Sequence, residues 1–395
     1  MRAVTVRLDE QLDLNDVARG DGHLFVRDGV GVAGRGVAAR VPREEIAAFL
    51  AAIDHDSEVD GVSPIAIGAL PFEPDAPADL IVPSVLVGKA ADGRRWVTRV
   101  GDGPHEDPHG VVSLPRPTAG VARFTIGEAA PVEQYLAAVV AARDAVAAGE
   151  LAKAVIAREV TVESDRPIDV HAVLLRLRAS FGSSYRYSID GFVGASPELL
   201  VRVDGNVVES HPLAGTAPRT GDPATDARIA AELIASTKNQ VEHRSVIEMV
   251  HDTLLPWCSY LDWEPEPSIV TVANVQHLGS RVEGWLSEPR PHVLDLVRAL
   301  LPTPALGGAP RAAALALIDR VEGFRRGRYG GAVGWVDAHG NGTWAVSIRC
   351  AELSPDRTRA RLVAGGGIVA ASDPAAELAE TQAKLQAMLS AIVRP

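Results

Sequence analysis

The amino-acid sequence predicts an α+β protein whose sheets are antiparallel. Short strand patterns come in runs with helices between the runs, and few segments repeat a strand–helix unit. Residues 185–210 hold four such patterns joined by tight turns, which favours antiparallel pairing over a doubly wound parallel sheet. The Ala-rich stretch 131–149 and the amphipathic stretch 226–254 predict the helices that separate these runs.

Length and charge limit the classes of function. The 395 residues are enough for one large core or for two domains. A net charge of −12 argues against general binding to nucleic acid or to an anionic membrane, so an anionic substrate would need a local basic pocket. We find neither a long apolar run nor a signal-peptide core, and we expect a cytoplasmic enzyme with no membrane partner. Two cysteines, Cys258 and Cys350, are too few for a disulfide framework or a zinc set.

The first third of the chain contains one formal nucleotide-binding motif. Gly29, Gly31 and Gly34 match the G-x-G-x-x-G pattern. A dinucleotide site needs a helix that begins at the third glycine, but here a strand pattern follows and ends at Pro42. We therefore interpret residues 22–41 as two strands with a hairpin turn at the glycines.

Groups that suit an anionic ligand gather in the last fifty residues. Residues 346–350 alternate like a strand, which puts Arg349 on a face that is otherwise small. A second strand pattern at 361–364 leads into three consecutive glycines at 365–367, whose backbone N–H groups would be bare. A lone arginine on a strand is usually a surface or salt-bridge residue, so it does not define a site by itself.

A helix is expected directly after the glycines. Asp373 is the predicted N-cap, and Pro374 occupies the first turn. Glu377, Glu380 and Lys384 fall at i, i+3 and i+7, hence on one face of this helix. Such a face is most often solvated. Together with an arginine and the glycine backbone, however, these groups could bind an anionic ligand through a hard metal ion.

Three residues elsewhere have both an ordinary and a chemical interpretation. Lys153 lies in an apolar strand pattern, either as an edge-strand lysine with a snorkelling side chain or as a desolvated base. Glu198 begins a strand pattern, either as an exposed turn acid or as a buried proton donor. Glu242 is either a helix-surface acid or a metal ligand that faces Glu380. Spacing alone does not show that these residues converge.

Eight stretches of the chain resemble the chorismate-utilising enzymes, the family of isochorismate, salicylate, anthranilate and aminodeoxychorismate synthases. They follow the family's order at residues 194–200, 211–219, 238–243, 302–310, 329–337, 347–351, 364–369 and 380–384. The resemblance implies a chorismate-binding, anthranilate synthase-like sandwich of two large antiparallel sheets with outer helices. It also implies one composite domain, residues 1–395, with a divergent N-terminal part (1–120) that supplies outer strands and a chorismate-binding catalytic part (121–395). Residues 101–120, rich in Gly, Pro, Asp and His, predict an exposed loop.

Four positions indicate which reaction the resemblance implies. Aminodeoxychorismate synthases carry a lysine where Ala214 stands, and anthranilate synthases usually lack the base found here at Lys153, so water is the expected nucleophile. Ala305 and Leu306 match isochorismate synthases and would form an apolar wall with no group to promote pyruvate elimination. We therefore expect an isochorismate synthase. A salicylate synthase is the alternative, followed by an ammonia-dependent anthranilate synthase component and a non-catalytic chorismate-binding module.

The resemblance also implies a role for each site residue. Lys153 would take a proton from the water that attacks C2 of chorismate, and Glu198 would protonate the departing C4 hydroxyl. Mg²⁺ would be held by Glu242 and Glu380, with Glu377 nearby. The expected substrate-binding residues are Gly215, Thr216, His277, Ala305, Leu306, Arg349, Gly365, Gly367 and Lys384. The product would be isochorismate, for menaquinone or for siderophore biosynthesis, made by a monomer without a glutaminase subunit.

Overall fold

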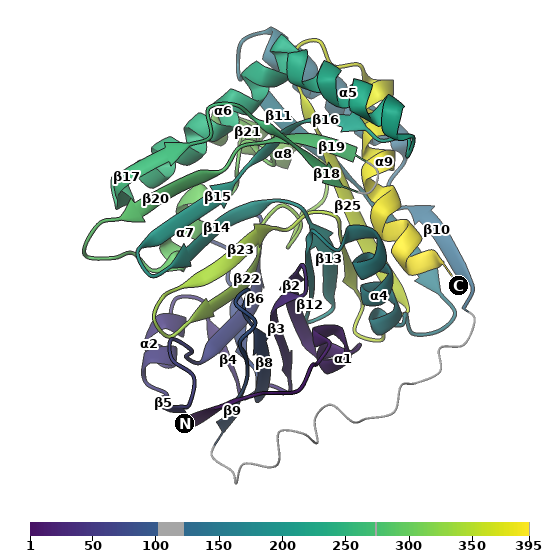
Figure 1. The fold of residues 1–395 in the computed structure, drawn as a ribbon. Helices are drawn as coiled ribbons and strands as arrows, with labels where there is room; N and C mark the ends of the chain where they lie inside the picture. The colour runs from purple at the N-terminus through teal and green to yellow at the C-terminus, as the bar shows by residue number, and fades with distance from the viewer. Residues whose placement is uncertain (102–121, 273–274, 395) are drawn as a thin grey trace.

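The computed structural model describes residues 1–101, 122–272 and 275–394. All but the first residue of the predicted loop 101–120 therefore lies outside the described residues. In the described part of the chain, the strands form sheets of thirteen, nine and three strands (Figure 1). Their pairing is antiparallel apart from one parallel pair, β1 with β5, so the prediction of an α+β fold with two large antiparallel sheets is confirmed.

The thirteen-stranded sheet joins strands from both ends of the chain. Its order is β10 (Phe124–Glu128), β11 (Lys153–Ser164), β25 (Arg359–Ile368), β24 (Cys350–Leu353), β13 (Phe192–Ser196), β12 (Tyr185–Ile189), β2 (His23–Arg27), β3 (Val30–Arg35), β8 (Val85–Lys89), β9 (Arg95–Gly101), β1 (Arg2–Arg7) and β5 (Asp54–Ser57), with β21 (Gly308–Ala309) paired to β11.

The nine-stranded sheet also contains strands from both parts of the chain. Its order is β17 (Cys258–Trp263), β20 (Val282–Leu286), β15 (Val207–His211), β14 (Leu199–Asp204), β23 (Gly342–Val346), β22 (Ala332–Asp337), β6 (Ile65–Leu70), β7 (Asp79–Val82) and β4 (Ala39–Pro42). A small third sheet has the order β16 (Leu213–Pro218), β19 (Val275–Gly279) and β18 (Ser268–Val272). The pairings of β12 with β2 and of β22 with β6 make the N-terminal strands continuous with both large sheets.

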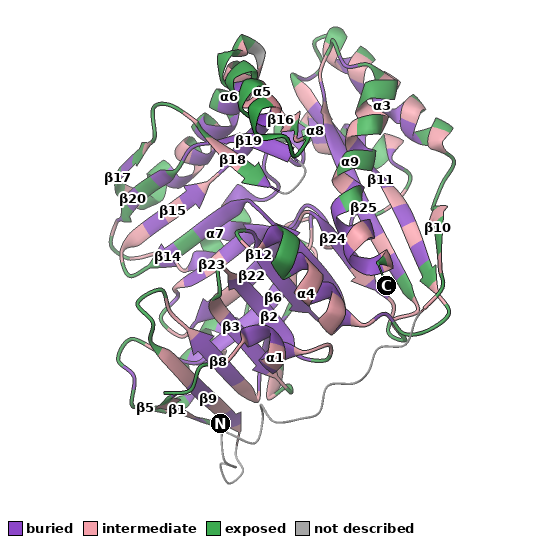
Figure 2. Ribbon diagram, turned by 45° about the vertical axis from the view of Figure 1, so that its right-hand side comes forward, coloured by how far each residue is buried: buried purple, intermediate pink, exposed green. Residues whose placement is uncertain are grey.

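The two large sheets enclose the main core, and helices cover their outer sides. Tyr187 of the thirteen-stranded sheet and Ile67 and Trp344 of the nine-stranded sheet are fully buried in this core. A second core lies between the thirteen-stranded sheet and three of the helices. Figure 2 shows buried strands inside and exposed helix faces outside. The helices are α1 (Leu14–Ala18), α2 (Ile46–Ala51), α3 (Val132–Ala147), α4 (Val170–Phe181), α5 (Pro223–Ala235), α6 (Thr237–Leu254), α7 (Val293–Leu300), α8 (Arg311–Val321), α9 (Pro374–Val393) and the 3₁₀ helix η2 (Leu255–Trp257).

Several local predictions are confirmed. The glycine motif is a hairpin: β2 and β3 pair across a turn in which Asp28 and Gly29 both have positive φ. The four strand patterns in 185–210 are β12 to β15. The Asp373 side chain accepts a hydrogen bond from the backbone N–H of Ala376 and caps α9 as expected. Among the described residues, none of the helices has the length and apolar character needed to cross a membrane.

The predicted single helix 226–254 is two helices. Ser236 leaves the helical region, with a φ of −72° and a ψ of 107°, and separates α5 from α6. Its side chain accepts a hydrogen bond from the N–H of Asn239 and so caps α6. Amphipathic periodicity continued across the break, which is why the sequence pattern did not reveal it.

The predicted strand 346–350 is also wrong. The chain leaves the nine-stranded sheet at Val346 and joins the thirteen-stranded sheet at Cys350. Between them the N–H of Ile348 donates to the carbonyl of Val346, and Arg349 has a φ of 51°. This crossing segment between the two sheets puts the arginine at the centre of the molecule rather than on a strand face.

Candidate active site

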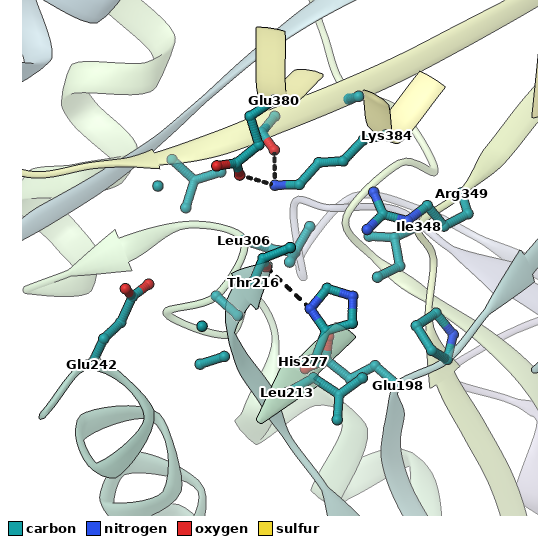
Figure 3. A pocket seen from close by; sticks show the side chains of 18 of the residues that line it. Glu198, Leu213, Thr216, Glu242, His277, Leu306, Ile348, Arg349, Glu380 and Lys384 are labelled. Carbon is teal, nitrogen blue, oxygen red and sulfur yellow. Dashed lines mark hydrogen bonds and ion pairs between the residues drawn. The ribbon is translucent and has the colours of Figure 1, made fainter. Parts of the chain in front are cut away.

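One cavity lies where the crossing segment, the small third sheet, β11, β25, α6 and α9 meet. Every site residue predicted from the sequence lines it, with the exception of Glu377. Figure 3 shows that the labelled side chains reach it from several elements, with Glu242 opposite Glu380 and Lys384. The lining residues from the prediction are Lys153, Glu198, Gly215, Thr216, Glu242, His277, Ala305, Leu306, Arg349, Gly365, Gly367, Glu380 and Lys384.

Lys153 is the first residue of β11 and is paired with a carboxylate across the cavity. Its Nζ donates to Oε1 of Glu242 on α6 over 2.5 Å. The side chain is 14% exposed, so it is not a solvated edge-strand lysine. A Cβ at Gly367, on the neighbouring strand, would overlap Cε of Lys153, so glycine at this position makes room for the lysine.

Glu198 is a buried carboxyl, which excludes its interpretation as an exposed turn acid. It precedes β14 and is 4% exposed. Burial raises the pKa of Glu198 to about 8, although the Leu213 N–H and the charges of Arg349 and Lys153 oppose this effect. The carboxyl is therefore mainly protonated at neutral pH and can donate a proton into the cavity.

Arg349 brings a buried positive charge to the cavity without a partner. It is 9% exposed, and among the described residues its guanidinium has no hydrogen bond or ion pair. Burial lowers the pKa of Arg349, although Tyr329 and Glu380 oppose the shift, which indicates the cost of burying this charge without a hydrogen-bonded partner. A carboxylate ligand would remove that cost, because it matches the planar fork of the guanidinium.

Lys384 and Glu380 form an ion pair on one face of α9. Nζ of Lys384 lies 2.6 Å from Oε1 of Glu380 and donates to the carbonyl of Gly365 over 2.7 Å. Burial lowers the pKa of Lys384, with Glu380 opposing the shift. Burial would raise the pKa of Glu380, but Lys384, Arg349 and Lys153 outweigh it and hold the pKa below its usual value.

The three glycines do not follow the strand predicted at 361–364 but continue it as part of β25. Gly365, Gly366 and Gly367 pair with Ala157, Ile156 and Val155 of β11. The N–H groups of Val155 and Ala157 donate to Gly307 and Glu322 instead of to β25. The backbone groups of Gly365 and Gly367 consequently point away from β11. The bond from Lys384 to the Gly365 carbonyl agrees with this direction.

The small third sheet contributes a neutral histidine. Nδ1 of His277 on β19 lies 3.1 Å from Oγ1 of Thr216 on β16. Burial lowers the pKa of His277 to about 3, so the ring is uncharged at neutral pH. Its Nε2 is buried and has no hydrogen-bond partner among the described residues. Gly215, next to Thr216, has a φ of 74°, which favours glycine.

The structure also adds residues that sequence reasoning missed. Tyr329 lines the cavity, and burial raises the pKa of its phenol to about 12. The resemblance at 329–337 includes this tyrosine but assigns it no role. Ile348 was expected to face away from Arg349, but the break in the strand lets both side chains line the cavity (Figure 3). The predicted wall at Ala305 and Leu306 lies in the loop before β21.

Two carboxylates in the cavity are available to a magnesium ion. Glu242 and Glu380 line the same cavity, but within the described ranges no three His, Cys, Asp or Glu side chains are grouped to hold a metal ion. Glu377 accepts a hydrogen bond from Ser372, and a Cβ at Gly366 would lie 2.7 Å from its Oε2 and 3.8 Å from Oε1 of Glu380. Magnesium commonly takes one or two carboxylates and completes its shell with substrate oxygens and waters, so the two-carboxylate set fits it.

Comparisons with known proteins show the family of the chain. The family model described as chorismate binding enzyme matches residues 113–393. MenF of Mycobacterium tuberculosis is 42% identical over 345 residues, 84% of this chain and 87% of that protein. The isochorismate synthase DhbC of Bacillus subtilis is 37% identical over 83% of this chain and 81% of its own length. A crystal structure of DhbC from Bacillus anthracis, 32% identical, superposes with a TM-score of 0.80 and covers 98% of each chain. The chain therefore belongs to the family of chorismate binding enzymes.

Proposed function

We propose that the chain is an isochorismate synthase that converts chorismate to isochorismate with Mg²⁺. The observation that carries the proposal is that one cavity holds both an acid and a base. The protonated carboxyl of Glu198 and the amine of Lys153 both line it. The reaction needs an acid to release a hydroxyl and a base to activate water. Relatives named isochorismate synthase support the same assignment.

Each of the two residues moves one proton. Lys153 accepts a proton from the water whose oxygen bonds to C2, and Glu198 donates its proton to the C4 hydroxyl, which leaves as water while the ring double bonds shift. One water enters and one leaves, so the step is an isomerisation. Lys153 can accept this proton only as the neutral amine, which still has an N–H group to donate to Glu242.

The cations and backbone donors of the cavity bind the two carboxylates of chorismate. The guanidinium of Arg349, which has no hydrogen bond within the described part of the chain, suits a bidentate contact, and the backbone N–H groups of Gly365 and Gly367 point to the same side as Lys384. Glu242 and Glu380 would hold Mg²⁺, which when bound would neutralise charge on a substrate carboxylate. The apolar wall at Ala305 and Leu306 offers no proton-transfer group, which favours release of isochorismate over pyruvate elimination.

The test is incubation of the purified protein with chorismate and Mg²⁺, without ammonia, followed by chromatography with mass detection. Isochorismate should form, and it should disappear with EDTA and in the Lys153→Ala and Glu198→Ala variants. Salicylate with pyruvate as the main products would instead assign a salicylate synthase. Unchanged chorismate that is consumed only after ammonium is added would assign an anthranilate-type enzyme.

A further inference from the structure

A buried ion pair lies behind the cavity and takes no part in the proposed chemistry. Glu322, just after α8, and Arg326 have side chains that are each 1% exposed. Nε of Arg326 donates to Oε2 of Glu322 over 2.9 Å, and Nη2 donates to Oε1. Neither residue lines the cavity. A buried pair of this kind is weak evidence for a contribution to stability, because desolvation of both charges offsets their attraction.

The remaining donors of Arg326 bind the backbone of two cavity walls. Nη1 donates to the carbonyl of Leu306 and Nη2 to the carbonyl of Val155, each over 2.6 Å. Both of these residues line the cavity. Glu322 in turn accepts the N–H of Ala157 over 2.8 Å. One ion pair therefore joins the loop that bears the apolar wall to the strand that begins with Lys153.

Other contacts make this connection rigid. The N–H of Val155 donates to the carbonyl of Gly307, and Lys153 pairs with Ala309 of β21. The guanidinium of Arg326 also stacks over Phe72, with 4.4 Å from its central carbon to the ring centroid. The wall and the lysine consequently belong to one unit, in which the guanidinium donates to a backbone carbonyl on each side.

We propose that the Glu322–Arg326 pair is a positioning device that fixes the apolar wall at Leu306 relative to Lys153, and so sets the turnover of the site. The proposal rests on the proposed function for the role of Lys153 and of the wall. The planar guanidinium of arginine is required at this position, because a single side chain must bind two backbone carbonyls and a carboxylate at the same time. A displacement of catalytic groups on the order of 1 Å is enough to lower turnover by about a hundredfold.

Arg328 provides a matched control two residues away. It also binds a carboxylate, Glu352, donates to the carbonyls of Ile189 and Asp190, and stacks over Phe192. None of these partners lines the cavity. Arg326→Lys and Arg328→Lys therefore remove similar sets of contacts, but only the first removes contacts to the cavity walls.

The experiment measures chorismate turnover and amide hydrogen exchange in wild type, Arg326→Lys, Arg328→Lys and the double variant Glu322→Leu/Arg326→Met. The double variant removes both buried charges, which is often tolerated by the fold. For Arg326→Lys and the double variant we expect kcat per folded molecule to fall at least about tenfold with KM changed less than about threefold. We also expect faster exchange in residues 302–309. Arg328→Lys should retain wild-type kcat and exchange in that loop.

Three results would overturn the positioning role. They are a folded Arg326 variant with wild-type kcat and loop exchange, a loss of thermal stability without a change in kcat per folded molecule, and an equal loss of kcat in Arg328→Lys. If wild type makes no isochorismate, the proposed function fails. The exchange measurement still decides whether Arg326 holds the loop, because it does not depend on the reaction.

Discussion

The protonated state of Glu198 can be tested through stability alone, with the variant Glu198→Gln. The pKa of about 8 in the folded protein lies above the ordinary value of 4.5, so the folded state binds this proton more tightly than the unfolded state. The stability that results is fully present below pH 4.5 and is lost as the pH rises through about 8. Ionisation of Glu198 should therefore lower the free energy of unfolding by roughly 1 kcal/mol near pH 5 and roughly 5 kcal/mol near pH 9.

Glutamine keeps the shape of the side chain and cannot ionise. In urea titrations, the free energy of unfolding of Glu198→Gln should rise by about 4 kcal/mol relative to that of wild type between about pH 5 and about pH 9. Other titrating groups are common to both proteins and cancel in the difference. A constant difference between Glu198→Gln and wild type across this pH range would refute the buried, protonated acid and with it the assignment of the proton donor.

Four further predictions concern activity. In the alkaline range, kcat/KM of wild type should fall about tenfold per pH unit above about 8, as Glu198 loses its proton, measured as a pH–rate profile. Arg349→Met should weaken chorismate binding at least about a hundredfold in calorimetry while leaving thermal stability equal or higher, because it removes an uncompensated buried charge. Gly367→Ala should displace Lys153 and lower kcat at least about tenfold with little change in KM, and an unaltered kcat would contradict the steric argument. Glu242→Gln and Glu380→Gln should each raise the Mg²⁺ concentration for half-maximal activity about tenfold or more, and EDTA should abolish the activity of wild type.

Much of the local structure could be predicted because its cause is local. The β2–β3 hairpin forms where Asp28 and Gly29 accept positive φ, and α9 begins where Asp373 can cap it. The α+β class followed from the succession of strand patterns. The resemblance supplied the identity of the site residues, which spacing could not have provided.

The predictions that failed in the sheets have a common physical reason: the strand that pairs with a segment can lie far from it in the sequence. Apolar and small or polar side chains alternate along residues 346–350 as they would in a strand, but the chain passes from one sheet to the other there. The sequence pattern is the same whether one strand continues or the chain changes sheets. The strand pattern was expected to end at 364, yet the glycines at 365–367 continue it, because β11, far earlier in the chain, pairs with them. Because these glycines have no side chains, they leave space for the side chains of Lys153, Glu377 and Tyr329.

By itself, the sequence determined the fold class, the ends of several elements, the family and the chemical types of the site residues. Only the tertiary structure decided the state of those residues. Burial raises the pKa of Glu198, Lys153 pairs with Glu242 across the cavity, and the guanidinium of Arg349 is buried with no hydrogen bond or ion pair to any residue that the structure describes. Burial and charge pairing arise between segments far apart in the chain, so they exist only once the sheets and helices have packed together.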